Sequence, residues 1–199
     1  MDAKADTAAR SRFHIAGLPT VVVTEAGGTE IDRTLGFLTA DDFITTVEGY
    51  RKGIGTLRAM LEEEASKKSD AKFAYKLGEK LFAHGRAEEA DARYAAVVAL
   101  DPENASGDAD DALISRVSVS RKSKNWAGCV GYCRDLLKRW PSSDLADDAT
   151  LGIAYYSAQG GMKKEALEAY SEYLARWPDG EDVEFAKKQI KELEAPAAY

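Results

Sequence analysis

Hydrophobic positions recur in three similar blocks between Ala71 and Pro178. Each block has a small residue, bulkier apolar residues four and seven positions later, and a proline twelve positions later. The three sets are Ala90, Tyr94, Val97 and Pro102; Cys129, Cys133, Leu136 and Pro141; and Ala166, Tyr170, Tyr173 and Pro178. Offsets of four and seven place side chains on one face of a helix, and proline then ends that helix. Steps of 39 and 37 residues between blocks are typical of stacked helical hairpins.

The N-terminal part follows a different pattern. The β-branched run Val21–Val23 predicts a buried strand, Gly27-Gly28 predicts a turn, and the alternation over 29–33 predicts a second strand, so together they predict a hairpin. Thr39 and Asp42 have the spacing of a helix N-terminal capping box. The helix that follows has an apolar face formed by Phe43, Val47 and Tyr50.

The three blocks resemble tetratricopeptide repeats (TPR). The first copy matches best, because its first helix also carries the family's signature residues, which are Ala74, Leu77, Gly78 and Leu81. In the second copy Arg116 and Val117 stand where Leu-Gly is expected. The third copy has Leu151-Gly152 and Tyr155, with two extra residues near Gly160-Gly161. The resemblance implies a helical solenoid that binds other proteins.

The N-terminal pattern resembles the second half of a thioredoxin fold over about residues 2–52. The residues that carry the resemblance are Ile15, Ala16, Gly17, Leu18, Pro19, Thr20, Gly27, Gly28, Gly36 and Phe43. The resemblance implies a cis peptide bond at Pro19 and a Leu18 backbone that contacts bound substrate. The family's Cys-x-x-Cys is absent, because no cysteine precedes Cys129. We therefore expect the chain to be a fragment whose first half lies upstream.

A thioredoxin-like hairpin without its first half would expose one edge of its first strand. An apolar edge strand is a template for pairing with another chain. One expectation is therefore a homodimer through the edge at Val21–Val23.

The predicted fold class is α+β overall and mostly α. We expect a partial thioredoxin-like segment over 1–52, a connecting helix over 53–70, three TPR-like hairpins over 71–180, and a capping helix with a tail over 181–199. The apolar face of the capping helix is formed by Val183, Ala186, Ile190 and Leu193.

Composition and charge restrict the partners. The 199-residue chain has a net charge of -7, which disfavours nucleic acid because phosphate binding needs a basic surface. No apolar run is long enough to span a membrane, and the first residues lack the apolar core of a secretory signal. We expect a soluble, bacterial protein of the cytoplasm or periplasm, since bacterial thioredoxin–TPR fusions resemble this order of segments.

Few residues suggest catalysis. Cys129 and Cys133 lie four apart on one helix face, at core positions of the repeat, and no nearby residues complete a zinc site. His14 and His84 are isolated, and no nucleophile accompanies either. Trp126, Trp140 and Trp177 are interpreted as packing anchors, although an exposed tryptophan could hold a partner. We expect no enzyme activity, cofactor or metal.

The leading functional hypothesis is a non-enzymatic protein-interaction module, a TPR scaffold or a chaperone-like binder of peptides. The candidate contact residues are the outward-turned positions of the first helices together with the residues before the hairpin, namely Leu18, Pro19, Lys72, Tyr75, Lys76, Glu79, Phe82, Ile114, Arg121 and Lys122. Tyr75 and Phe82 would be apolar contacts, whereas basic residues such as Arg121 could hold a carboxylate. An ordinary mixed surface is the alternative interpretation. The alternative function is the C-terminal fragment of a thiol–disulfide oxidoreductase whose Cys-x-x-Cys lies upstream.

Overall fold

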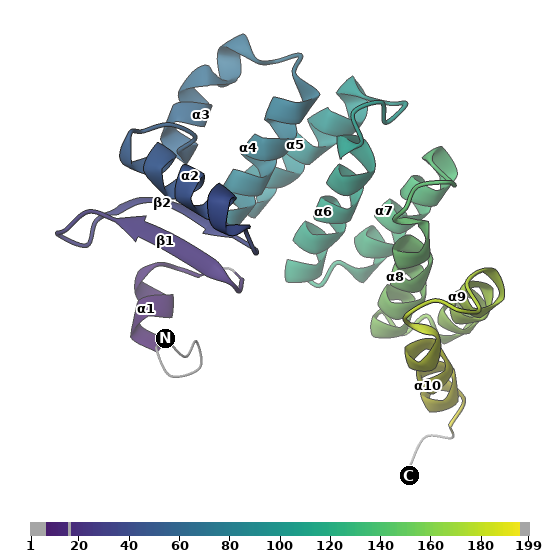
Figure 1. The fold of residues 1–199 in the computed structure, drawn as a ribbon. Coiled ribbons are helices and arrows are strands. Elements are labelled where there is room, and N and C mark those ends of the chain that lie inside the picture. The colour runs from purple at the N-terminus through teal and green to yellow at the C-terminus, as the bar shows by residue number, and fades with distance from the viewer. Residues whose placement is uncertain (1–6, 16, 196–199) are drawn as a thin grey trace. The chain divides into compact units, whose positions relative to one another are not determined.

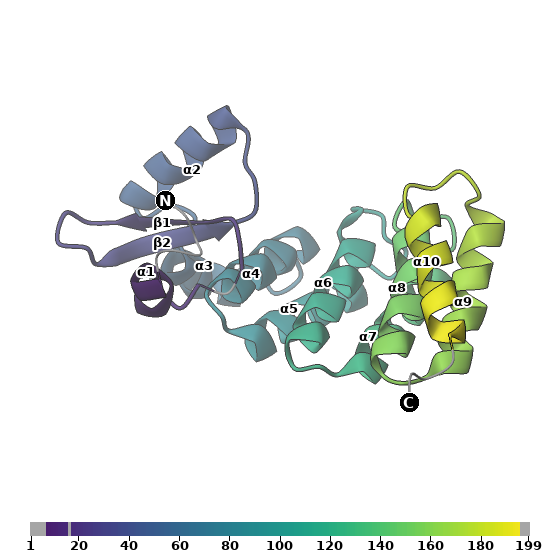
Figure 2. The ribbon, with the colours of Figure 1, turned by 90° about the horizontal axis from the view of Figure 1, so that it is seen from below.

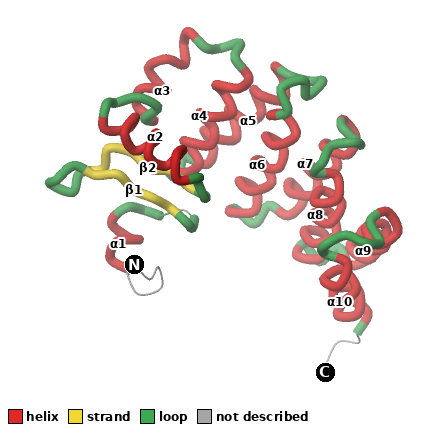
Figure 3. The backbone as a smooth tube through the Cα atoms, viewed as in Figure 1, coloured by secondary structure: helices red, strands yellow, loops and turns green. Residues whose placement is uncertain are grey.

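The structure of this protein is a computed structural model that describes residues 7–15 and 17–195. Figures 1 and 3 show helices over most of this part of the chain and one small sheet. The expected α+β, mostly helical architecture with a repeat region is therefore confirmed. Ala16, one of the residues that carry the thioredoxin resemblance, and most of the predicted tail lie outside the described residues. The chain divides into two compact units, 1–100 and 101–199, which are described in turn.

Within its described residues, the first unit has two strands and five α-helices, with one short 3-10 helix after α3. Their bounds are α1 Thr7–Arg12, β1 Thr20–Thr24, β2 Glu30–Leu35, α2 Ala40–Arg51, α3 Leu57–Glu63, the 3-10 helix Glu64–Ser66, α4 Ala71–Ala83 and α5 Ala87–Leu100. The second unit contains α6 Asp108–Lys122, α7 Trp126–Arg139, α8 Ala146–Gln159, α9 Lys163–Arg176 and α10 Val183–Glu194.

The predicted hairpin is confirmed. β1 and β2 pair antiparallel, with Val22 opposite Arg33 and a bulge at the Val23–Thr24 step. Gly28 ends the turn at a φ of 80°, a left-handed conformation that glycine adopts without a steric penalty. α1 and α2 lie on opposite sides of the hairpin (Figures 1 and 2). The expectation that Val21–Val23 is buried is wrong, because all three valines are only half-buried in a sheet of two strands.

The predicted capping box at the start of α2 is confirmed in its Thr39 half, whereas the Asp42 carboxylate bonds the Thr39 hydroxyl and not the Thr39 N–H. The Thr39 hydroxyl accepts a hydrogen bond from the Asp42 N–H at 3.2 Å and donates one to the Asp42 carboxylate at 2.7 Å. These bonds satisfy a backbone donor that the first turn of a helix leaves unpaired. Of the predicted apolar face, Tyr50 is buried while Phe43 remains 39% exposed.

α4 and α5 form the first helical hairpin. Its core consists of the predicted positions, all with no exposed surface, namely Leu77, Leu81, Ala90, Tyr94 and Val97. Gly78 allows the two helices to approach closely, because a Cβ at this position would lie 2.6 Å from Cε1 of Tyr94. Gly78, one of the signature residues of the predicted repeat, is therefore a steric requirement.

The second unit repeats this arrangement in α6–α7 and α8–α9, and α10 covers the last hairpin. Ala166, Tyr170 and Tyr173 are buried at their predicted positions, and Ala186 of α10 has no exposed surface. Trp140 and Trp177 end α7 and α9 with nearly the same backbone angles, φ/ψ of -132°/71° and -128°/66°. The Trp140 Nε1–H also donates to the Pro102 carbonyl at 3.1 Å, which supports its predicted packing role.

The two cysteines are core residues, as predicted, and both are free thiols. Cys129 is 0% and Cys133 1% exposed, and burial raises the pKa of the Cys133 thiol to about 12. Because the thiolate is the reactive form, we expect neither cysteine to react with iodoacetamide at pH 8 until the second unit unfolds. Mass spectrometry of the alkylated protein, native and in urea, measures this. Rapid alkylation of the native protein would contradict the buried assignment.

Candidate protein-binding surfaces

A buried carboxylate, Asp32 of β2, lies at the centre of a polar cluster in the first unit. Its Oδ1 accepts hydrogen bonds from the Arg33 N–H at 2.6 Å and from Lys80 Nζ at 3.0 Å, and lies 3.0 Å from His84 Nε2. Its Oδ2 accepts from the Leu57 N–H at 2.5 Å, at the start of α3. Asp32 therefore connects β2 with both α3 and α4.

The second half of this cluster surrounds the Lys80 ammonium. Lys80 Nζ donates to the Arg33 carbonyl at 3.1 Å, hydrogen-bonds the Tyr50 hydroxyl and lies 3.9 Å from the centre of the Tyr50 ring. The Tyr50 hydroxyl donates to the same carbonyl at 3.2 Å. We call Asp32, Arg33, Tyr50, Lys80 and His84 the Asp32 cluster.

Burial and the charges within the cluster shift the pKa values of Asp32 and Tyr50. Burial alone would raise the pKa of Asp32, but the His84 hydrogen bond, the Lys80 charge and the two backbone N–H groups outweigh it and hold the pKa below its usual value. Burial, reinforced by the Asp32 charge, raises the pKa of Tyr50 to about 12. The cluster thus holds an ionised carboxylate whose oxygens already accept hydrogen bonds. Its role is structural, because it connects β2 with α3 and α4.

The interpretation of His84 as isolated is wrong. Its ring contacts Asp32, and its Nδ1 lies 3.9 Å from the Glu30 carboxylate. The sequence contained one local signal for this contact, since Lys80 and His84 are four residues apart and so share a face of α4. Their partner on β2 is far away in the sequence, which is why the contact was missed.

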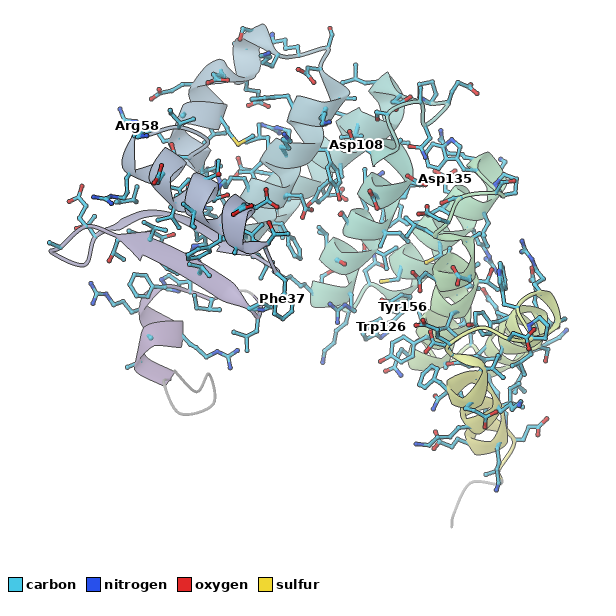
Figure 4. All side chains as sticks on the ribbon, in the orientation of Figure 1. Phe37, Arg58, Asp108, Trp126, Asp135 and Tyr156 are labelled. Carbon is cyan, nitrogen blue, oxygen red and sulfur yellow. The ribbon has the colours of Figure 1, made fainter. Side chains whose placement is uncertain are left out.

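Leu18 and Pro19, two of the predicted contact residues, lie beside β1, and their peptide bond is cis, as the resemblance implies. They line an apolar groove of about 790 Å³ that runs along β1 and α1. Its other lining residues include Phe13, Ile15, Val22 and Phe37. Leu18 is 57% and Phe37 92% exposed, and Figure 4 shows Phe37 at the end of the hairpin.

The predicted contact residues of the first repeat lie along α4. Lys72 and Lys76 are exposed, while Phe82 is half-buried. Tyr75 packs against Tyr94 with ring centres 6.0 Å apart, and the Tyr94 hydroxyl donates to Glu79 at 2.5 Å. Glu79 is thus engaged within its own hairpin. A role of these residues in ligand binding stays a prediction.

The predicted contact residues of the second repeat, Ile114, Arg121 and Lys122, lie on α6. Ile114 is half-buried, whereas Arg121 and Lys122 are exposed in the last turn. Partial burial and the neighbouring Arg121 charge lower the pKa of Lys122. The two cations at this helix end therefore lie close enough to repel each other.

Three aromatic residues that the sequence analysis did not assign to the site accompany these cations. Trp126 stacks on Tyr156, with ring centres 6.2 Å apart and an interplanar angle of 13°, and Tyr155 meets Tyr156 edge-on at 5.2 Å. Figure 4 shows Trp126 and Tyr156 side by side. Burial raises the pKa of Tyr156, and the positive charge of Arg121 opposes this rise, so the phenol lies within electrostatic range of the guanidinium. We call Arg121, Trp126, Tyr155 and Tyr156 the aromatic–cationic cluster.

The signal for this cluster in the sequence was the consecutive pair Tyr155-Tyr156. A helix rotates about 100° per residue, so two adjacent tyrosines cannot both lie at the centre of a buried face. Tyr155 is indeed 37% exposed.

Two features are absent from residues 7–15 and 17–195. No helix there is long and apolar enough to cross a membrane. No group of three or more His, Cys, Asp or Glu side chains in this part of the chain is arranged to hold a metal ion.

Comparison with known proteins supports part of the predicted family assignment. Residues 148–180, which contain most of α8, all of α9 and the turn after α9, match a family model described as a tetratricopeptide repeat. No curated protein matches the chain. The thioredoxin-like assignment of the hairpin and the oxidoreductase alternative both stay predictions. Both thiols of this chain are buried in α7. The third helical hairpin is therefore similar to a tetratricopeptide repeat, which supports the predicted TPR repeats.

Proposed function

We propose that this protein is a non-enzymatic protein-binding module that holds a peptide carboxylate at the aromatic–cationic cluster. The observation that carries this proposal is the stacked pair Trp126–Tyr156, whose phenol lies within electrostatic range of Arg121 and whose Tyr156 belongs to the hairpin that matches a TPR repeat. Such repeats commonly bind other proteins.

The chemistry of the cluster suits an acidic peptide group flanked by an apolar side chain. The Arg121 guanidinium is planar and can donate two parallel hydrogen bonds to a carboxylate. Arg134 and Arg139 pair with Glu165 and Asp135, whereas Arg121 is exposed at the end of α6. The partly exposed Tyr155 ring adds an amphipathic surface of the type enriched at binding sites.

The proposal predicts that Arg121→Ala weakens binding of carboxylate peptides. A random peptide library displayed with free C-termini is selected on the wild-type protein. The enriched peptides are then synthesised and titrated by fluorescence anisotropy. We expect the variant to bind them about 10–100-fold more weakly, because a hydrogen bond to a charged group contributes about 1.5–3 kcal/mol.

Arg139→Ala is the matched control. Arg139 lies on α7 and pairs with Asp135 at 2.9 Å, so its removal should leave binding unchanged. Equal affinity of wild type and Arg121→Ala would refute the assignment of this cluster. A selection that enriches no peptide would argue against the protein-binding function itself.

A further inference from the structure

We propose that β1 forms an antiparallel pair with β1 of a second copy of this chain, around a two-fold axis at Val22. The two hairpins would then form one continuous sheet. This inference does not depend on the aromatic–cationic cluster. It rests on the sequence of β1 and on a difference between the two edges of the sheet. Side chains bond outward-directed backbone groups of β2, whereas those of β1 are open.

The edge of β2 is closed by the Asp32 cluster. In an antiparallel ladder, successive residues direct their N–H and C=O groups alternately towards the partner strand and away from it. Arg33 lies at an outward-directed position, because its N–H bonds the Asp32 side chain and its C=O accepts from Lys80 and Tyr50. These side chains occupy the N–H and C=O groups of Arg33, at the middle of β2, that a further strand would need.

The edge of β1 is open. The Pro19 carbonyl accepts from the Gly36 N–H at 2.9 Å, so Pro19 and every second residue after it face β2. The N–H and C=O groups of Thr20, Val22 and Thr24 therefore point to the other edge. Among the described residues, no other element bonds these groups. An open edge strand of this kind readily accepts another strand.

The sequence of β1 is the same in both directions, Thr-Val-Val-Val-Thr. With a two-fold axis at Val22, Thr20 of each chain lies opposite Thr24 of the other, and Val22 lies opposite its own copy. All three are positions whose backbone groups face the open edge, so each pair can exchange two hydrogen bonds. Threonine and β-branched pairs are favourable across strands, and no like charges face each other.

The apolar groove beside β1 favours the same partner. Its exposed residues lie at one end of the hairpin, Leu18 before β1 and Phe37 after β2, and a second hairpin at the open edge would shield part of this apolar surface from water. Because a two-fold interface uses the same surface on both chains, one pairing event covers both grooves.

Sedimentation equilibrium of the full chain tests the proposal. We expect the wild-type protein to have twice the mass of one chain at about 100 µM and to dissociate upon dilution towards about 1 µM. Val22→Lys would place two lysines opposite each other across the axis and should give a monomer, as should Val22→Glu. An equimolar mixture of the two variants should restore the dimer, because opposite charges then face each other. Val22→Thr keeps an uncharged β-branched residue and should remain dimeric.

Disulfide formation between single cysteine variants tests the register. Thr20→Cys and Thr24→Cys should not cross-link separately, since the same residue in the two chains would be about 14 Å apart. A mixture of the two should cross-link, because directly opposite Cα atoms lie about 5.5 Å apart, within disulfide range. A wild-type mass of one chain at every concentration would overturn the proposal. Cross-linking of Thr20→Cys with itself but not with Thr24→Cys would overturn it as well.

Discussion

Asp32→Ala is expected to lower the free energy of unfolding of the first unit by about 3–5 kcal/mol, the usual cost of removing one partner from a buried ion pair. The Lys80 ammonium, whose side chain is only 10% exposed, would lose its carboxylate partner. The Leu57 N–H would also lose its acceptor at the start of α3. Urea unfolding followed by circular dichroism measures the change.

Glu62→Ala is the control for this variant. Glu62 pairs with Arg58 at 3.0 Å, but both side chains are mostly exposed, so the loss should stay below about 1 kcal/mol. A loss of this small size for Asp32→Ala would contradict the structural role of the Asp32 cluster.

The pH dependence of stability gives a second readout of the same residue. The pKa of Asp32 is lower in the folded protein than in the unfolded chain, so its stabilising contribution is complete above the unfolded value of about 3.9. The contribution is lost as the pH falls through the folded pKa. The difference in unfolding free energy between wild type and Asp32→Asn should therefore shrink below about pH 4. A difference that stays constant down to pH 2 would argue that Asp32 is not ionised in the fold.

The second large effect is expected for Gly78→Ala in α4. The new Cβ would lie 2.6 Å from Cε1 and 2.9 Å from Cδ1 of Tyr94. This ring has no exposed surface, and its hydroxyl is bonded to Glu79, so it cannot move without losing packing or that bond. We expect the free energy of unfolding to fall by about 1–3 kcal/mol, as for overpacked cores, despite the higher helix propensity of alanine.

Gly131→Ala in α7 is the matched control. A Cβ at this helical position meets no atom within 4 Å. The substitution should therefore stabilise the protein by about 0.5–1 kcal/mol, because glycine is unfavourable within a helix. Unfolding of both variants in urea tests the pair. The same sign of effect in both would contradict the steric interpretation of Gly78.

The sequence predicted the elements whose signals are local. The hairpin cores around Tyr94 and Tyr170 followed from helical periodicity, and the start of α2 followed from Thr39 and Asp42. Each of these patterns spans at most a few helical turns, and the side chains that contact each other are close together in the sequence.

The Asp32 cluster could not be predicted in this way. Lys80 and His84 lie 48 and 52 residues after Asp32, and nothing local to β2 indicates that α4 will pack beside it. The aromatic–cationic cluster could not be predicted for the same reason, since Trp126 and Tyr156 come from different helices. Contacts of this kind depend on how elements pack, and periodicity determines only which face of each element is buried.

The closed edge of β2 also limits how large an assembly through β1 can become. Antiparallel pairing of two hairpins produces a four-stranded sheet in the order β2–β1–β1–β2, whose outer edges are both capped by side chains of the Asp32 cluster. A hairpin with two open edges would instead add copies without end and form fibrils. In such a dimer, the buried carboxylate and its donors would obstruct a further strand at each outer edge, and they would limit the assembly to two chains.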